Sequence, residues 1–396
     1  MAAAWPTITL DDAVDLFDSQ RVPLNSRQRH ARQGKFPYYG AQGVIDHIDD
    51  YIFDGHYILV AEDGENLYSK KLPLALFVKG KFWVNNHAHI LRGKPEIVDD
   101  TFLLACLNNA DIRPFVTGAA QPKLSQGNLR LVEIPHPPLH IQQRIAGILS
   151  AYDELIENSQ RRIKILEAMA RGLYREWFVH FRFPGHENHP RVASALGKIP
   201  QGWEVKTIQD FGKVVTGKTP SKANAGFFGK DVPFVKTPDM HGNLFILDTN
   251  ESLSTVGANS QANKTLPVGS ICVSCIGTIG VVSITTEECQ TNQQINSVVL
   301  AKSEYREFLF FRLQEAKQAL ENLGSNGATM GNVNKSKFES MEIVAPPNAH
   351  LFDFHRLTQP MFNSILNLTR QVQNLRRTRE LLLPRLLSGQ INVEVP

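Results

Sequence analysis

The sequence predicts an α/β (α+β) protein built from two tandem globular domains, each followed by a long helix, with the two helices pairing as a coiled coil. Three observations support this fold class: an internal repeat, two long segments with apolar residues at heptad spacing, and mixed strand and helix patterns ahead of them. At 396 residues the chain also exceeds the size at which single cores usually stop growing, about 250–300 residues.

The repeat is carried by two matched stretches in each half of the chain. Trp5–Asp12 matches Trp203–Asp210 at an offset of 198, sharing the Trp, a Thr and the second Asp. Val132–Pro138 matches Met341–Pro347 at an offset of 209, which indicates an insertion of 11 residues in the second copy. The matched apolar positions just upstream are Leu124 with Val333 and Leu129 with Phe338.

A long helix is expected after each Pro-Pro pair. Apolar residues recur at steps of three and four, with polar residues between them, which favours coiled-coil pairing over a single amphipathic helix on a globular core. Arg379 interrupts the second seam, and Pro384 is expected to kink or end that helix. The seam positions are Ile145, Ile148, Tyr152, Leu155, Ile156, Ser159, Ile163, Leu166, Ala170, Leu173 and Trp177, then Met361, Ile365, Leu368, Val372, Leu375, Leu382 and Leu386.

The segments ahead of the helices combine short β-rich runs, such as Tyr57–Val60 and Ile271–Val273, with helical stretches, such as Thr101–Asn108 and Tyr305–Leu323. The expected organisation is a first globular domain at 1–138, a first long helix at 139–182, a linker at 183–198, a second globular domain at 199–346 and a second long helix at 347–396.

Composition excludes several classes of protein. With 42% hydrophobic and 20% charged residues, the chain is neither disordered, collagenous nor membrane-spanning. A net charge of +3 does not by itself indicate a polyanionic partner. The four cysteines form no disulfide framework and the N-terminus lacks a secretory pattern, so a cytoplasmic location is expected.

Three motifs suggest chemistry, and their contexts argue against it. Gly212–Thr219 matches the phosphate-binding-loop pattern, but no buried strand precedes it and no apolar periodicity follows it, so a flexible basic loop is expected. Cys272 and Cys275, or His87 with His89, lack the further ligands that a zinc site needs. We therefore expect no metal and no catalytic residues, with the two cysteines on a Val- and Ile-rich strand and the histidines facing the same way.

Two basic runs occupy the same place in the two copies of the repeat. Residues 21–35 and residues 211–230 are each free of acidic side chains. A single run is usually a solvated surface, but two in register suggest contacts to phosphates, while nearby amides can read base edges. The candidate DNA-binding residues are Arg27, Arg29, Arg32, Lys35, Asn85, Asn86, His87, Lys213, Lys218, Lys222, Gln293 and Gln294.

Several stretches together resemble the specificity subunits of type I restriction-modification systems. Pro137–Asn158 and Glu167–Phe178, continuing to Phe183–His186, are similar to the central conserved region of that family, and Leu382–Val393 is similar to the end of its second conserved helix. His350–His355 departs from the family pattern, because it lacks the Gln-rich start found at Gln142–Arg144; the second helix is therefore expected to begin later or to meet its partner differently. Stretches that resemble target-recognition domains are Tyr38–Gly43, Trp83–His89, Gly217–Pro220, Ile276–Gly280 and Thr291–Gln294.

The resemblance implies a non-catalytic subunit that reads double-stranded DNA. Each target-recognition domain would read one half of a bipartite site. The two helices would be antiparallel and would dock two modification (methyltransferase) subunits, with restriction subunits outside them. S-adenosylmethionine, ATP and Mg²⁺ would belong to those partners, leaving no cofactor in this chain. Trp177 and Phe178, at the end of the first helix, are candidates either for partner docking or for the core.

Three alternatives remain at this stage. A P-loop NTPase would bind nucleotide and lose it on Lys218→Ala, and a pure coiled-coil scaffold would show no DNA sequence preference even with a methyltransferase present. Within the family, the chain could serve a fused restriction enzyme that cuts on both sides of its site, which only the partner's sequence would distinguish.

Overall fold

The structure, a computed structural model, describes residues 5–118, 120–325 and 331–393. The chain divides into two compact units: unit 1 comprises Met1–Asn158 with Val372–Pro396, and unit 2 comprises Ser159–Gln371. The expected division gave each long helix a segment of its own. Contacts instead divide both helices between the units, because each globular core needs a helical strip from each of them to close it.

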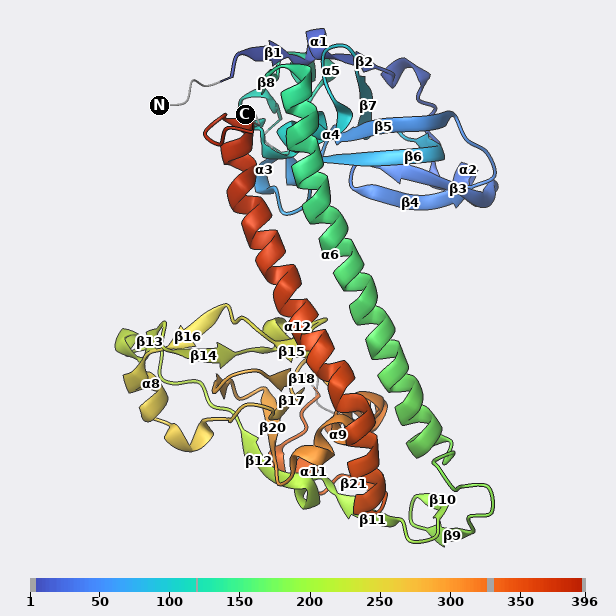
Figure 1. The fold of residues 1–396 in the computed structure, drawn as a ribbon, viewed down its shortest axis with the longest axis vertical. Helices are drawn as coiled ribbons and strands as arrows, with labels where there is room; N and C mark the ends of the chain where they lie inside the picture. Colours follow the sequence, from blue (N-terminus) through green and yellow to red (C-terminus); the bar gives the residue numbers. More distant parts are fainter. Residues whose placement is uncertain (1–4, 119, 326–330, 394–396) are drawn as a thin grey trace. The chain divides into compact units, whose positions relative to one another are not determined.

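Unit 1 is built on a six-stranded sheet with the order β2-β7-β5-β6-β3-β4 (Figure 1). Neighbouring strands are antiparallel except β3 and β6, and a separate pair, β1 and β8, joins the two ends of the domain. The elements are β1 (Thr7–Thr9), α1 (Leu10–Ala13), β2 (Val14–Leu16), η1 (Asp18–Gln20), α2 (Ser26–His30), β3 (Gln33–Gly40), β4 (Gly43–Ile48), β5 (Phe53–Ala61), α3 (Asn66–Ser69), β6 (Ala75–Val84), β7 (Ala88–Gly93), α4 (Asp100–Asn109), η2 (Arg113–Phe115), α5 (Gln126–Arg130) and β8 (Glu133–Pro135).

Unit 2 has a five-stranded sheet, β12-β20-β17-β18-β15, and a four-stranded sheet, β13-β16-β14-β19. A further pair, β11 and β21, repeats the pairing of β1 and β8. The elements are η3 (Arg175–Val179, π-helical), β9 (Arg191–Ser194), β10 (Gly197–Pro200), β11 (Glu204–Thr207), η4 (Ile208–Phe211), β12 (Gly212–Thr216), η5 (Ala225–Phe227), β13 (Phe228–Gly229), β14 (Val232–Val235), α7 (Thr237–Met240), β15 (Phe245–Ile246), β16 (Glu251–Leu253), α8 (Thr255–Asn259), η6 (Ala262–Lys264), β17 (Ile271–Ser274), β18 (Val282–Thr285), β19 (Gln290–Thr291), β20 (Ile295–Leu300), η7 (Ser303–Tyr305), α9 (Arg306–Glu315), α10 (Lys317–Gly324), α11 (Lys335–Glu339) and β21 (Glu342–Ala345).

The internal repeat is confirmed down to single hydrogen bonds. Thr9 pairs with Glu133, and Thr207 pairs with Glu342. The amide of Leu10 donates to Val132 O at 2.9 Å, and that of Ile208 donates to Met341 O at 3.2 Å. Both offsets found in the sequence, 198 and 209, are therefore the offsets that relate the two folded copies. The caps agree as well, since Ser125 caps α5 and Asn334 caps α11.

The two long helices are α6 (Leu139–Tyr174, 36 residues) and α12 (Asn348–Leu387, 40 residues). Within unit 1, the start of α6 shares a core with the end of α12 (Figure 1). Within unit 2, the end of α6 shares a core with the start of α12. The helices are therefore antiparallel in both units. Arg379, which interrupts the apolar seam, forms an ion pair with Asp153 of α6.

Four details of the helices differ from expectation. Helix α12 begins at Asn348 rather than later, because Leu351 and Phe354 anchor its first turns in the core without a Gln-rich start. Pro384 does not end α12, which continues to Leu387. Only the proline itself lacks a backbone N–H, so the residues after it can still complete a helical turn. Leu155 is 50% exposed, because the apolar seam of α6 continues through the buried Ile156 instead. The stretch 305–323 is broken into α9 and α10 at Ala316.

The expected linker at 183–198 is more ordered than the sequence suggests. Phe183 is buried, with its ring centroid 4.7 Å from that of His350 and 5.4 Å from that of Trp203. Strands β9 and β10 then form an antiparallel hairpin whose turn uses Gly197 at a φ of +100°. None of the described helices is long and apolar enough to cross a membrane.

Candidate nucleic-acid interface

A short turn rich in amides precedes the equivalent strands β7 and β20. In unit 1, Asn85 Oδ1 accepts a hydrogen bond from the amide of His87 at 2.8 Å. In unit 2, Asn292 Oδ1 accepts one from the amide of Gln294 at 3.2 Å. Both asparagines are buried, so the repeat builds the same asparagine-stabilised turn twice.

The turn exposes some of the candidate base-contacting residues and buries others. Asn86, His87 and Gln293 are exposed and Gln294 is half-buried. Asn85 is 7% exposed and its oxygen is engaged within the turn, so its predicted role as a free amide is wrong. The side chain of Gln294 accepts from Asn292 Nδ2 at 2.9 Å, which leaves its own amino group available.

In unit 1, two of the predicted cations hold the fold rather than lie in a flexible loop. Arg29, on helix α2, donates to Asp46 at 3.1 Å and to Leu24 O at 2.7 Å, and its guanidinium lies over Tyr38. Hydrogen bonds from Gln33, from the amide of His47 and from Arg29 hold the pKa of Asp46 below its usual value. Sequence proximity misleads here, because the acids come from another strand, β4.

Arg32 is engaged in the same way. It donates to Asp49 at 2.9 Å and its guanidinium lies 4.9 Å from the Trp83 ring centroid. Arg27 and Lys35 are the exposed cations of this run, with the Lys35 ammonium 5.2 Å from the Phe36 ring centroid. Unit 1 therefore offers fewer cations to a polyanion than its sequence suggests.

A cavity of about 520 Å³ in unit 1 joins helix α2 to the amide turn. Arg29 and the turn residues Asn85, Asn86 and His87 line it. Asn25 and Gln28 also line it, and these two residues form a capping box at the start of α2. The sequence analysis missed both, although an Asn followed three residues later by Gln is a recognisable helix-start signal.

In unit 2, the basic loop after β12 also contacts the amide turn. The amide of Lys218 donates to Thr291 O at 2.9 Å, and Thr219 Oγ1 donates to Gln293 Oε1 at 2.6 Å. The approach requires glycine, since a Cβ on Gly217 would lie 2.1 Å from Asn292 O. Lys213, Lys218 and Lys222 are exposed, so both repeats place basic side chains beside an amide turn.

The same geometry argues against a nucleotide loop at Gly212–Thr219. Residues Gly212–Thr216 form strand β12, paired with β20, rather than a flexible loop, so that expectation is wrong for them. Pro220–Asn224 then runs as a loop into a three-residue turn, whereas a phosphate-binding loop must open a helix.

The predicted metal candidates do not share a site. Cys272 lies on β17, as expected, and packs in a different core cluster from Cys275. Burial raises the pKa of Cys272 to about 12 and that of Cys275 to about 11, so both are neutral thiols. His87 and His89 also part: exposed His87 lies 2.6 Å from Asp63 Oδ2, while buried His89 lies 2.6 Å from Asp18 Oδ2. Among the described residues no group of three potential ligands is close enough to hold a metal.

Trp177 and Phe178 belong to the core of unit 2, so of the two roles left open by the sequence their burial supports the core. Each is 7% exposed. The Phe178 ring centroid lies 4.8 Å from that of Phe354 and 4.9 Å from that of Phe308. The π-helical turn η3 places both rings on the same side as Tyr174, facing the globular part of unit 2 rather than solvent.

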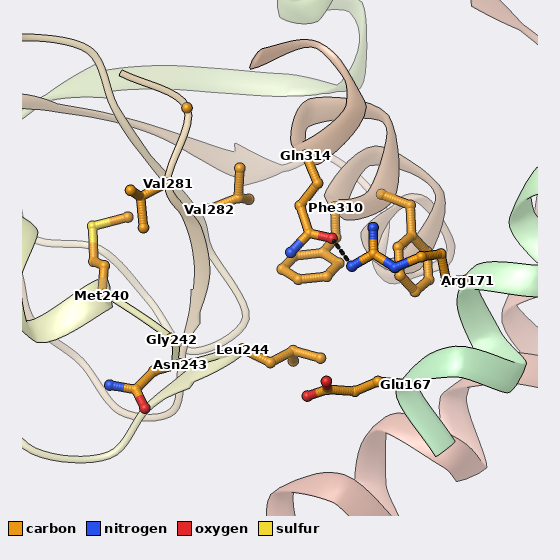
Figure 2. A pocket seen from close by; sticks show the side chains of 12 residues that line it. Glu167, Arg171, Met240, Gly242, Asn243, Leu244, Val281, Val282, Phe310 and Gln314 are labelled. Carbon is orange, nitrogen blue, oxygen red and sulfur yellow. Dashed lines mark hydrogen bonds between the residues drawn. The ribbon is translucent and has the colours of Figure 1, made fainter. Parts of the chain in front are cut away.

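Unit 2 has another cavity, of about 380 Å³, between α6, α9 and the loop that follows α7 (Figure 2). Arg171 lines this cavity; its guanidinium donates to Gln314 Oε1 at 2.8 Å and lies over the Phe311 ring. Glu167 forms no ion pair in the part of the chain that the structure describes, and burial raises the pKa of its carboxyl group. The floor is apolar, from residues including Leu244, Val282 and Phe310.

Comparison with known proteins identifies the class that this fold and site define. The type I restriction modification DNA specificity domain matches twice, at residues 3–168 and 200–350. The chain therefore belongs to the family of type I restriction-modification DNA specificity proteins, and within it is a specificity subunit with two tandem recognition domains.

Individual relatives agree with this assignment. The chain is 30% identical to the specificity subunit of the type I restriction enzyme HindI from Haemophilus influenzae, over 83% of this chain and 86% of the relative. It is also 30% identical to the MjaIX specificity subunit of Methanocaldococcus jannaschii, over 70% of this chain and 65% of that protein. The crystal structure of an S subunit from M. genitalium shares the fold, with a TM-score of 0.67 at 14% identity, covering 97% of this chain and 96% of that one.

Proposed function

We propose that this chain reads a bipartite double-stranded DNA site without catalysing a reaction, one recognition unit for each half of the site. The observation that supports this most directly is the repeated placement of a basic segment against an amide turn: Arg29 and Asn85 line one cavity in unit 1, and Lys218 is hydrogen-bonded to Thr291 in unit 2. Cations suit phosphates and amides suit base edges, so one such surface supplies both positioning and reading.

The remaining parts of the proposal concern the complex. Two modification subunits dock on the antiparallel helices, and restriction subunits join outside them. S-adenosylmethionine, ATP and Mg²⁺ are bound by those partners rather than by this chain. A cytoplasmic location is supported by the four cysteines, all of which are buried free thiols.

The positioning role makes a prediction for Lys218. Its exposed ammonium is free to neutralise one phosphate, so Lys218→Ala should weaken binding of the assembled complex to all sequences and lower the salt slope by roughly one unit. Fluorescence anisotropy with labelled duplexes at several salt concentrations measures both. Lys198→Ala, another exposed lysine of unit 2, is the control; an equal loss there would mean that only total charge matters.

The reading role makes a prediction for Gln293. Gln293→Ala removes an exposed amide that can bind a base, so discrimination at one base pair of the second half-site should fall by about 1–3 kcal/mol with an unchanged salt slope. Competition with duplexes substituted at single positions measures it, with exposed Gln209→Ala as control. If Gln293→Ala lowers the melting temperature and leaves the methylated motif intact, the amide serves only the turn, through Thr219.

The proposed function as a whole is tested by a single-molecule methylation map of host DNA with and without the chain. We expect a split motif that disappears with the gene for this chain and returns with its expression. An unchanged map, with modification subunits present, would exclude the proposed function.

A further inference from the structure

A buried polar contact follows each amide turn, and it uses different chemistry in the two units. In unit 1, His89 is 1% exposed and lies four residues after Asn85. In unit 2, Asn296 is 2% exposed and lies four residues after Asn292. Neither residue touches solvent enough to contact DNA, so any influence on reading must act through the turn.

Both residues contact equivalent positions of the repeat. His89 Nε2 lies 2.8 Å from Leu124 O, and Asn296 Nδ2 donates to Val333 O at 3.0 Å. Leu124 and Val333 differ by the offset of 209 found in the sequence. The two side chains therefore fasten the same strand to the same carbonyl.

The second contact of each residue also follows the repeat. His89 Nδ1 lies 2.6 Å from Asp18 Oδ2, and Thr216 Oγ1 donates to Asn296 Oδ1 at 2.6 Å. Asp18 and Thr216 are related by the offset of 198; Asp18 lies three residues before the first basic run, and Thr216 lies within the second. One buried side chain thus joins the amide turn to the start of the basic segment in each unit.

The chemistry of the contact differs between the copies. Leu124 O and the Asp18 carboxylate are both acceptors, and the two ring nitrogens of His89 lie between them. Asp18 also accepts from the amide of Ile90 at 2.9 Å, and Arg21 lies 3.3 Å from it. In unit 2 the same positions are neutral, since an amide and a hydroxyl complete each other's hydrogen bonds.

We propose that His89 and Asn296 are equivalent positioning residues, each of which fixes an amide turn against its basic segment and so sets the accuracy of one half-site. The proposal rests on the proposed function and deepens it. The two contacts differ in charge but occupy equivalent places. We therefore expect that the two residues of a contact can be exchanged only together, as a His–Asp pair or as an Asn–Thr pair.

The test is carried out on the full chain assembled with its modification subunit. His89→Asn alone removes the contact of the His89 ring with the buried Asp18 carboxylate, and we expect discrimination in the first half-site to fall about tenfold. Asp18→Thr combined with His89→Asn recreates the contact of unit 2 and should restore that discrimination. Discrimination in the second half-site, measured with the same protein, should stay unchanged in both variants.

Unit 2 supplies a matched variant in which the new side chain has nearly the same shape as the one it replaces. Asn296→Asp keeps the acceptor for Thr216 but removes the donor to Val333 O, so it should reduce discrimination in the second half-site only. This variant also carries the test if His89→Asn does not fold, because the two units are altered independently.

The outcomes separate the two proposals. If the unaltered chain yields no split motif, the proposed function fails. If it yields one, but neither His89→Asn nor Asn296→Asp changes discrimination, or the double variant fails to restore it, or both half-sites change together, the positioning role is overturned.

Discussion

Replacing residues 1–138 with the corresponding segment of a relative is expected to change one half of the methylated site completely and leave the other half as it was. The segment carries the first amide turn, helix α2 and the cavity between them. The second amide turn and its basic loop lie in unit 2, with its own core. Since no residue of the second reading surface is replaced, its specificity should persist.

The exchange boundary falls immediately before Leu139, where α6 begins. Its control is the reverse replacement of 199–346, which should change the other half only. The measurement is the methylation map of host DNA. A change in both halves after either exchange would show that the two recognition domains do not read independently.

Phe178→Ala is expected to have the largest effect on stability. Its ring lies within 6 Å of the rings of Trp203, Phe308 and Phe354, all buried in the core of unit 2. Removing it leaves a cavity that rigid aromatic neighbours cannot fill, so we expect the free energy of unfolding of unit 2 to fall by about 3–5 kcal/mol. Urea denaturation of the isolated chain, followed by tryptophan fluorescence, measures this.

The neighbouring residue Val179 is 37% exposed, so Val179→Ala controls for a change in the same π-helical turn and should have a small effect. Trp177→Ala should resemble Phe178→Ala, since its ring centroid lies 5.8 Å from that of Phe354. The result that would contradict a core role is an unchanged unfolding curve together with loss of assembly with the modification subunit.

The architecture could be predicted from the sequence because each matched stretch of the repeat is held by contacts between residues that are close in sequence. Thr9 and Asp12 repeat at Thr207 and Asp210 because each threonine hydroxyl donates to its aspartate, a bond within one turn of chain. The long helices were similarly predictable, because their seams follow a fixed spacing. Details that depend on one residue, such as the break between α9 and α10 at Ala316, were not.

The candidate site was only partly predictable, because partners distant in sequence decide which side chains are free. Arg29 and Arg32 belong to an acid-free run, yet Asp46 of β4 and Asp49, which follows β4 directly, form ion pairs with them. Asn85 and Asn86 are adjacent amides, yet one is buried in the turn and the other is exposed. The contact between His89 and Asp18 spans 71 residues and leaves no local pattern.

The composition of unit 1 also has a consequence for synthesis on the ribosome. Its core includes Leu386, Leu387 and Val393 from the last residues of the chain, packed with Leu149 and Ile145 of α6. Unit 2 ends at Gln371, whereas unit 1 also includes residues after Gln371. The ribosome therefore completes unit 2 before unit 1, although unit 1 begins earlier in the sequence. The first recognition domain therefore keeps part of its apolar surface uncovered until Leu386, Leu387 and Val393 have been synthesised, after all of unit 2.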